Sequence, residues 1–189
     1  MCRGPLLYAR SMTKFQYYVA SSLDGFIADD RHGLDWLLDF GFEAFQEHFD
    51  RFFADVGAVV LGASTYEWIL REQPDNWDFG ARPAWVLTHR RLPVPPNSDI
   101  RFASGEILPI ADAARAEAGE RNVWIVGGGP TAAQFLDVGR LDEVLVTYMP
   151  VVLGRGKPLL PVATMTPRLT LARTTPFPNG AVEHVYRTS

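Results

Sequence analysis

The sequence of 189 residues is poor in cysteine, in net charge and in long apolar runs. Its single cysteine, Cys2, excludes an internal disulfide and any site built from two cysteines. The 18 basic and 22 acidic residues leave a net charge of -4, which gives no electrostatic attraction to nucleic acid or to an anionic membrane. No apolar run reaches the length of about 18 residues that a membrane span needs. We therefore expect a cytoplasmic protein without nucleic-acid or membrane partners.

Motifs of several enzyme classes are also missing from the sequence. The histidines His32, His48, His89 and His184 are not spaced as metal ligands, so the sequence predicts no metal site. The Gly-x-Ser-x-Gly nucleophile elbow does not occur. The phosphate loop of nucleotide hydrolases is absent as well, which disfavours ATP hydrolysis.

The composition is that of a globular domain. With 47% hydrophobic and 12% aromatic residues, the chain is too apolar to be disordered, and its length suits one domain with a sizeable core. A β-rich stretch begins directly after residues 1–11, so we expect these residues to be a disordered extension. Residues 12–189 are expected to form the single domain.

Apolar runs alternate with helical patterns along the chain. Strands are expected at 14–20, 26–28, 58–61, 84–88, 100–102, 122–126 and 143–148, and near 169–173 and 181–187. Helices are expected at 66–71, 109–118 and 131–138, and along the series Phe42, Phe45, Phe49, Phe52 and Phe53, where Gly57 would end the helix. Parallel strands need long crossovers, whereas the last two strands are joined by a turn at 178–180. The sequence thus predicts one α/β domain, with a mostly parallel sheet and an antiparallel C-terminal edge.

The strongest local signal is the run Gly127, Gly128 and Gly129, which joins a buried strand to a helix that begins near Thr131. Residues without side chains let a phosphate approach the backbone, and a helix N-terminus supplies N–H donors and a positive dipole end. A tight turn without a ligand is the alternative. The spacing also fits a loose Rossmann fingerprint, but the next strand ends at Tyr148 without the acidic residue which that fold needs.

Two other strand ends carry chemistry that suits a phosphate. One has a glycine and two hydroxyls at a helix start, and the other has a hydroxyl followed by basic residues: Gly62, Ser64 and Thr65, then Thr88, His89, Arg90 and Arg91. A guanidinium can bond two phosphate oxygens at once, although such arginines are more often solvated loop charges. Ligands of open α/β sheets bind outside the carboxyl ends of the strands. Three such ends together indicate a cofactor with several phosphates.

Asp24, at the end of the first strand, is a candidate for acid–base chemistry, and Asp35 precedes Trp36. A carboxylate at such a place binds ring nitrogens or moves a proton. The alternative for Asp24 is turn formation, because Asp-Gly is a turn pair. The loop 154–157 either holds a substrate anion or is an ordinary solvated hairpin loop.

Five segments, in order, resemble the dihydrofolate reductase superfamily: 20–28 with 33–37, 60–67, 126–129, 139–143 and 149–159. The resemblance is greatest to the branch that contains the reductase domain of bacterial riboflavin biosynthesis, the RibD C-terminal domain, and its single-domain relatives. It covers the chain from about Met12 onward. It implies a three-layer dihydrofolate reductase-like fold. It also implies a homodimer that pairs through the C-terminal strands, with Val185 on the outward apolar face.

The resemblance further implies NADPH, bound across the three strand ends. In that arrangement Gly62, Ser64 and Thr65 meet phosphates, Thr88, His89 and Arg90 lie by the ribose and its 2′-phosphate, Gly127, Gly128, Gly129 and Thr131 hold the pyrophosphate, and Ala20 flanks the nicotinamide. Asp24 and Trp36 are expected to face the substrate, with Asp24 as the catalytic acid. Ala63 stands where many members have arginine, which removes one phosphate contact.

The activity that this resemblance implies is hydride transfer from NADPH to a small heterocyclic substrate. The riboflavin branch reduces 5-amino-6-(5-phosphoribosylamino)uracil, and a pterin is the alternative substrate. A non-catalytic, dimeric nucleotide-binding protein is the alternative from another class, because few acid–base residues stand out in the sequence.

Overall fold

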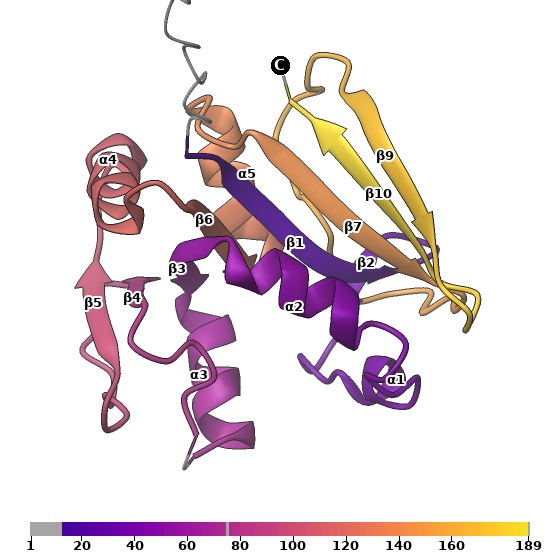
Figure 1. The fold of residues 1–189 in the computed structure, drawn as a ribbon, viewed down its shortest axis with the longest axis horizontal. Helices are drawn as coiled ribbons and strands as arrows, with labels where there is room; N and C mark the ends of the chain where they lie inside the picture. Colours follow the sequence, from indigo (N-terminus) through magenta and orange to yellow (C-terminus); the bar gives the residue numbers. More distant parts are fainter. Residues whose placement is uncertain (1–12, 75, 189) are drawn as a thin grey trace, which may run out of the picture.

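An eight-stranded sheet crosses the middle of the part of the chain that the computed structural model describes, residues 13–74 and 76–188 (Figure 1). Its strand order is β5-β4-β3-β6-β1-β7-β10-β9. Neighbours from β5 to β7 are parallel, and β10 and β9 are antiparallel additions at one edge. The predicted sheet is therefore confirmed. The expected extension at 1–11 lies outside the described residues.

The strands of the large sheet are β1 Phe15–Ser22, β3 Val56–Gly62, β4 Pro83–Leu87, β5 Asp99–Ala103, β6 Asn122–Gly127, β7 Glu143–Met149, β9 Thr170–Pro176 and β10 Val182–Arg187. A small second sheet pairs β2 Phe26–Ala28 with β8 Lys157–Pro158. The helices are α1 Asp35–Leu38, α2 Gln46–Ala54, α3 Ala63–Glu72, α4 Ile107–Ala118 and α5 Gly129–Asp137.

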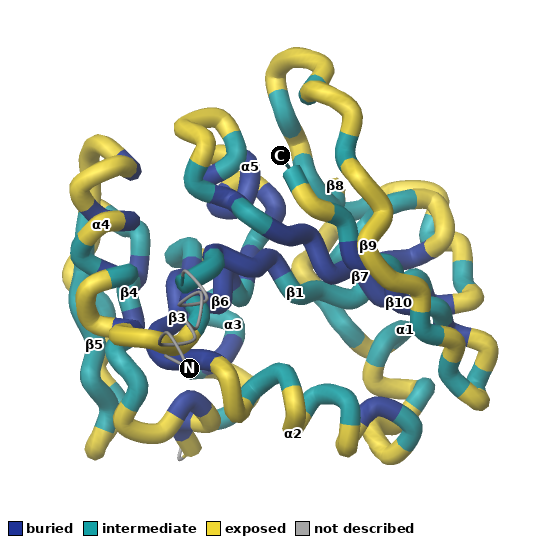
Figure 2. The backbone as a smooth tube through the Cα atoms, turned by 45° about the horizontal axis from the view of Figure 1, so that its top comes forward, coloured by how far each residue is buried: buried dark blue, intermediate teal, exposed yellow. Residues whose placement is uncertain are grey.

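Helices cover both faces of the sheet, so the fold has three layers (Figures 1 and 2). Side chains alternate between the faces of a strand, and β1 shows the consequence. Phe15 and Tyr17 lie in the core beneath α4 and α5, where Phe15 contacts Phe135 of α5. Tyr18 points to the opposite face, where it packs on Phe52 of α2. The two apolar layers hold the strand ends in fixed positions.

The region around α2 differs from the sequence prediction. The helix begins only after Phe45, so Phe42 and Phe45 precede it, and it ends at Ala54. Gly57 does not end the helix but lies inside β3, where a Cβ atom would collide with the backbone of Ala118 in α4. The glycine therefore serves close strand–helix packing rather than helix termination. The short helix α1 and the strand β8 were not predicted from the sequence, because both are too short to show a repeated apolar pattern.

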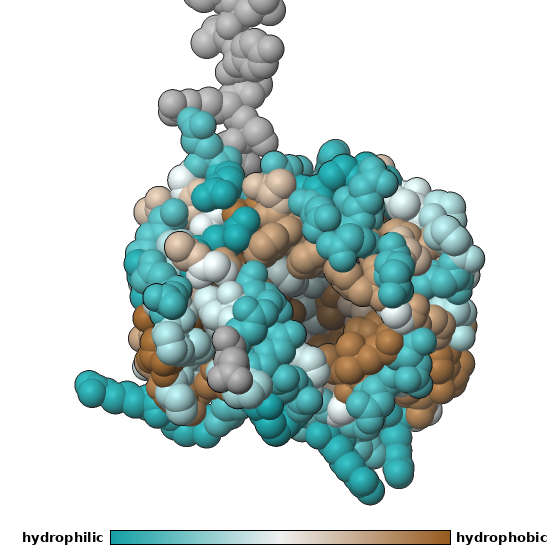
Figure 3. Space-filling view, turned by 60° about the horizontal axis from the view of Figure 1, so that its bottom comes forward, coloured by the Kyte–Doolittle hydropathy of each residue, from teal (hydrophilic) through white to brown (hydrophobic). Residues whose placement is uncertain are grey.

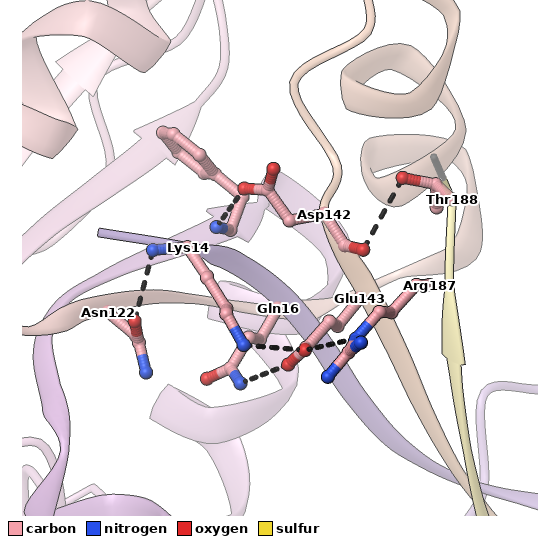
Figure 4. A network of polar contacts seen from close by, with 8 residues as sticks. Lys14, Gln16, Asn122, Asp142, Glu143, Arg187 and Thr188 are labelled. Carbon is pink, nitrogen blue, oxygen red and sulfur yellow. Dashed lines mark hydrogen bonds and ion pairs between the residues drawn. The ribbon is translucent and has the colours of Figure 1, made fainter. Parts of the chain in front are cut away.

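A polar network ties the starts of β1 and β7 to the end of β10 (Figure 4). Glu143 accepts hydrogen bonds from Lys14 Nζ at 2.7 Å and Gln16 Nε2 at 2.8 Å, and Arg187 Nε lies 3.7 Å away. Burial opposes ionisation of Glu143, but these donors and the charges of Lys14 and Arg187 outweigh it and lower its pKa. The network thus fixes the antiparallel edge by an ionised, mostly buried carboxylate.

Candidate active site

A cavity of about 760 Å³ opens at the carboxyl ends of the parallel strands. Gly62 of β3 pairs in register with Leu87 of β4, and Leu61 with Gly127 of β6, so these strands end at the same edge. Pairing between β1 and β6 stops at Tyr17 and Ile125, and residues beyond it on both strands line the cavity. Figure 3 shows the hollow, with hydrophobic side chains along its margin. This is the place where open α/β sheets bind ligands.

One part of the cavity, the glycine end, is built from two helix starts. Its residues are Gly62, Ser64, Thr65, Gly127, Gly128, Gly129, Thr131 and Lys157. Helix α3 follows Gly62 and helix α5 follows Gly128, and neither helix has a side-chain cap on its first N–H groups. Unsatisfied N–H donors and the positive end of a helix dipole favour an anion. Most of the residues predicted to bind the cofactor are brought together here, and Ala20 also lines the cavity.

Glycine is found at the positions of this end for different structural reasons. A Cβ atom on Gly129 would lie 2.7 Å from the backbone oxygen of Leu159, and one on Gly62 would lie 2.6 Å from Thr131 Oγ1. These two glycines allow close internal packing. A Cβ atom on Gly128 would meet nothing nearer than Pro130 Cδ at 3.7 Å. The surface above Gly128 therefore belongs to the cavity, and the residues present fit a group that must approach the backbone, as a pyrophosphate does.

Lys157, from the loop 154–157 that was a candidate for holding a substrate anion, adds a positive charge to the glycine end. It lies in β8 next to Pro158, whose backbone oxygen packs against Gly129. Arg155, in the same loop, is engaged at the surface with Asp30 at 2.8 Å. No aspartate or glutamate is among the described residues that line the cavity. The strand pairing of β2 with β8, which brings Lys157 here, leaves no periodic signal in the sequence.

The rest of the cavity, the aromatic end, is apolar. Its residues are Tyr18, Leu37, Leu38, Phe42, Phe45, Phe49, Trp124 and Met149. Phe49 lies between Phe42, with ring centroids 5.4 Å apart, and Trp124, with centroids 5.8 Å apart. The phenylalanine series predicted one face of an amphipathic helix. In the structure Phe49, Phe52 and Phe53 of α2 are partly buried against the sheet, and Phe49 also forms part of the cavity wall.

Tyr18 and Thr147 are residues of the lining that carry hydroxyl groups. Burial and, next in weight, the charge of Glu183 raise the pKa of Tyr18 well above its usual range, although Arg173 and the Thr147 side chain act the other way. The phenol is therefore neutral at physiological pH. Tyr18 and Thr147 offer hydrogen bonds without charge.

The third predicted strand end is less directly involved. Leu87 lines the cavity, but Thr88, His89 and Arg90 lie outside the lining. Thr88 Oγ1 accepts a hydrogen bond from the Arg90 backbone N–H at 3.0 Å, and the Arg90 guanidinium binds Glu67 of α3. Hydrogen bonding to this carboxylate raises the pKa of Arg90 further. The structure thus gives Arg90 a protein partner at the position expected for the 2′-phosphate.

Asp24 also lies outside the lining. Its carboxylate accepts hydrogen bonds from Ser22 Oγ at 2.6 Å and from the backbone N–H groups of Leu153 at 3.1 Å and Gly154 at 2.6 Å. The Ser22 bond, with the two backbone bonds, lowers the pKa of Asp24 although desolvation opposes them. An ionised Asp24 holds the 153–154 loop to the end of β1, and its role as a substrate-facing acid stays a prediction.

Trp36 packs behind the cavity wall. It belongs to a cluster with Phe45, Met149 and Ala181, while its neighbours Leu37 and Leu38 form the wall itself. The indole nitrogen is buried and has no hydrogen-bond partner within the described residues. The predicted contact of Trp36 with the substrate is untested by this arrangement.

Residues 13–74 and 76–188 hold no group of three or more histidine, cysteine, aspartate or glutamate side chains that could bind a metal. Within those same ranges, no helix has the length and apolar character needed to cross a bilayer.

The fold and the cavity define an α/β protein of the dihydrofolate reductase type. Dihydrofolate reductase from Enterococcus faecalis, in complex with NADP(H) and RAB-propyl, aligns over 93% of this chain and 96% of its own, with a TM-score of 0.60 at 16% identity. Within that class the chain belongs to the RibD C-terminal domain family, whose model matches residues 77–182.

Two relatives cover nearly the whole chain. The uncharacterized protein YwjB of Bacillus subtilis (strain 168) is 32% identical over 177 residues, which are 90% of this chain and 95% of YwjB. A crystal structure of a protein assigned provisionally to riboflavin biosynthesis in Shewanella sp. PV-4 is 25% identical, with a TM-score of 0.80 over 94% of this chain and 99% of that one. The sequence resemblance to this superfamily is thereby confirmed.

Proposed function

We propose that this protein is an NADPH-dependent reductase that acts on a small ring-containing substrate. The observation that carries the proposal is the open surface of Gly128 between two uncapped helix starts, in a cavity whose other end is aromatic. The dihydrofolate reductase with a similar fold was solved with NADP(H). When bound, NADPH supplies a hydride from its nicotinamide ring.

The glycine end is the proposed seat of the cofactor's phosphates. Backbone N–H groups at the starts of α3 and α5 would bind the pyrophosphate, with the hydroxyls of Ser64, Thr65 and Thr131 beside them. Lys157 adds a fixed positive charge. Thr88, His89 and Arg90 keep their proposed place by the adenosine ribose, and Ala20 by the nicotinamide.

The chain's own contribution to catalysis is mainly positioning. The strand ends and the helix starts would hold the cofactor and the substrate in one cavity, so that the reacting atoms meet at a short and fixed distance. The apolar wall excludes water from the reacting face. Asp24 would act as a positioning residue, through the loop it binds, and its role as the catalytic acid is the alternative.

The identity of the substrate has two candidates from the family. The riboflavin intermediate 5-amino-6-(5-phosphoribosylamino)uracil carries a phosphate, for which His32 and Lys157 are the side chains in the described lining that can carry positive charge. A pterin is uncharged but needs polar partners for its ring nitrogens. The non-catalytic alternative, a dimeric protein that binds the nucleotide without turnover, is consistent with a lining that has no carboxylate among its described residues.

Calorimetric titration with NADPH, followed by turnover measurements, tests the proposal. We expect saturable binding of NADPH and its oxidation in the presence of at least one ring ketone, imine, pterin or the riboflavin intermediate. Binding without any turnover would favour the non-catalytic alternative. Absence of binding would contradict both.

A further inference from the structure

We infer that the aromatic end of the cavity takes an uncharged, planar ring compound, rather than a phosphorylated or carboxylated one. The inference rests on the proposed function and names the substrate class of the same site. It departs from the phosphoribosylated substrate that the riboflavin branch implies.

The walls of the aromatic end suit a flat ring. Tyr18, Phe49 and Trp124 form a packed group whose ring centroids lie about 6 Å apart, at 6.2 Å for Tyr18 to Phe49 and 5.8 Å for Phe49 to Trp124. Phe42 extends this wall toward solvent, where it is 48% exposed. Aromatic rings pack favourably against other rings in stacked or edge-on arrangements. A planar, apolar ligand would continue that packing.

None of the residues that define the aromatic end is charged. Lys157 lies beside the glycine end, and His32 lines the cavity from the exposed loop that precedes α1. Asp29 Oδ1 accepts hydrogen bonds from the backbone N–H groups of Arg31 and Gly33 at 2.8 and 2.7 Å, and these bonds fix this loop. A carboxylate or phosphate moved into the aromatic end would lose water without gaining an ionic partner there, and such desolvation is costly.

Hydrogen bonding at this end is available in neutral form. Tyr18 remains protonated because burial raises its pKa, and Thr147 is almost fully buried at 5% exposure. These hydroxyls match a ligand with one carbonyl or imine group on an otherwise apolar ring. The aromatic end therefore selects against charge while it still accepts a polar atom.

The test uses two probes that differ by one carboxylate group, the neutral 2-acetonaphthone and the anionic 6-acetyl-2-naphthoate. Each is titrated into the full protein by calorimetry, first without and then with saturating NADP⁺, and NADPH binding is measured separately. We expect the dissociation constant of the neutral ketone to be at least about tenfold lower than that of the carboxylate. Equal or tighter binding of the carboxylate would overturn the inference. If the protein does not bind NADPH, the proposed function is contradicted. The inference about the aromatic end is still tested in that case, because the probes are also compared without nucleotide.

Two arginine variants, one at the aromatic end and one outside the lining, form a test and its matched control. Leu38 lines the aromatic end and is 64% exposed, whereas Leu23 is 60% exposed and lies outside the lining. Leu38→Arg should reverse the preference toward 6-acetyl-2-naphthoate, and Leu23→Arg should leave it unchanged. Both side chains are exposed, so neither substitution disturbs the core. An unchanged preference in Leu38→Arg, or an equal change in both variants, would contradict the assignment of the aromatic end as the binding surface.

Discussion

The guanidinium of Arg90 forms two hydrogen bonds with the carboxylate of Glu67, at 2.9 and 2.8 Å. The pair joins the loop after β4 to helix α3, just outside the cavity. The family resemblance implies that Arg90 lies by the 2′-phosphate of NADPH. A 2′-phosphate at this place would compete with Glu67 for the same donors, so we propose that the pair influences the choice between NADPH and NADH.

The first prediction concerns that choice. Arg90→Ala should weaken NADPH binding by about tenfold and leave NADH binding unchanged, because only the former loses a charge-assisted bond. Glu67→Gln should strengthen NADPH binding, since the competing carboxylate is gone. Parallel titrations with both nucleotides measure these changes.

Arg91 is the control for this prediction. It is exposed in the same loop, and no ion pair of Arg91 is present within the described residues. If Arg91→Ala rather than Arg90→Ala lowers the preference for NADPH, the phosphate lies on the neighbouring arginine. Equal weakening of both nucleotides by Arg90→Ala would show that this loop does not distinguish them.

The second prediction concerns stability and pH. The pKa of Glu143 is lower in the folded protein than in the unfolded chain, so its contribution to stability is present above about pH 4.5 and is lost as the pH falls through the folded value. Glu143→Gln should lower the free energy of unfolding at neutral pH by about 1–2 kcal/mol, less than for a fully buried pair because Lys14 is partly exposed.

Urea denaturation at several pH values checks this prediction. The difference in stability between the parent protein and Glu143→Gln should shrink as the pH falls from about 6 to about 3. A difference that stays constant over that range would mean that the Glu143 charge does not stabilise the fold.

The third prediction separates two roles of Asp24. If Asp24 only holds the backbone N–H groups of Leu153 and Gly154, the variant Asp24→Asn should remain active. Its melting temperature should be lower, and its KM higher, than those of the parent protein. The pH profile of kcat should then be the same as in the parent protein. If the pH profile of kcat in Asp24→Asn no longer shows the ionisation of an acidic group, this would instead support Asp24 as the catalytic acid.

The fourth prediction concerns assembly, where we propose a homodimer. Strand β9 pairs only with β10 among the described strands, and its other edge is exposed. Val185, expected on the outward face, is only 5% exposed and packs inside the subunit, whereas Leu171 of β9 is 51% exposed. Leu171→Lys is therefore the informative substitution. Sedimentation equilibrium at micromolar concentration should give the mass of two chains for the parent protein and of one chain for the variant; a one-chain mass for the parent would reject the dimer.

Much of the fold could be predicted from the sequence, because apolar runs and glycine turns mark the strands and their ends. The glycine end followed from local signals at Gly62 and Gly128, which depend on residues close in the chain. The sequence marked the loop 154–157 as a possible anion site, but the position of Lys157 at the glycine end could not be predicted, since it depends on the pairing of β8 with the distant strand β2. The bond of Arg90 to Glu67 depends on where α3 lies relative to the β4 loop. Periodicity likewise predicted the apolar face of α2 but not the part of that face that lines the cavity.

The central claim is that the surface of Gly128 receives the nucleotide. The backbone there, with φ of -80°, is not in the left-handed region, and a Cβ atom meets no close contact, so Gly128→Val should fold with an unchanged circular dichroism spectrum. Gly129→Ala is the contrasting variant, because its Cβ meets the backbone of Leu159 and should cost about 1–3 kcal/mol of stability. Calorimetric titration of folded Gly128→Val with NADPH is the most direct measurement: a loss of affinity of at least about 30-fold is predicted, and an unchanged affinity would contradict the account.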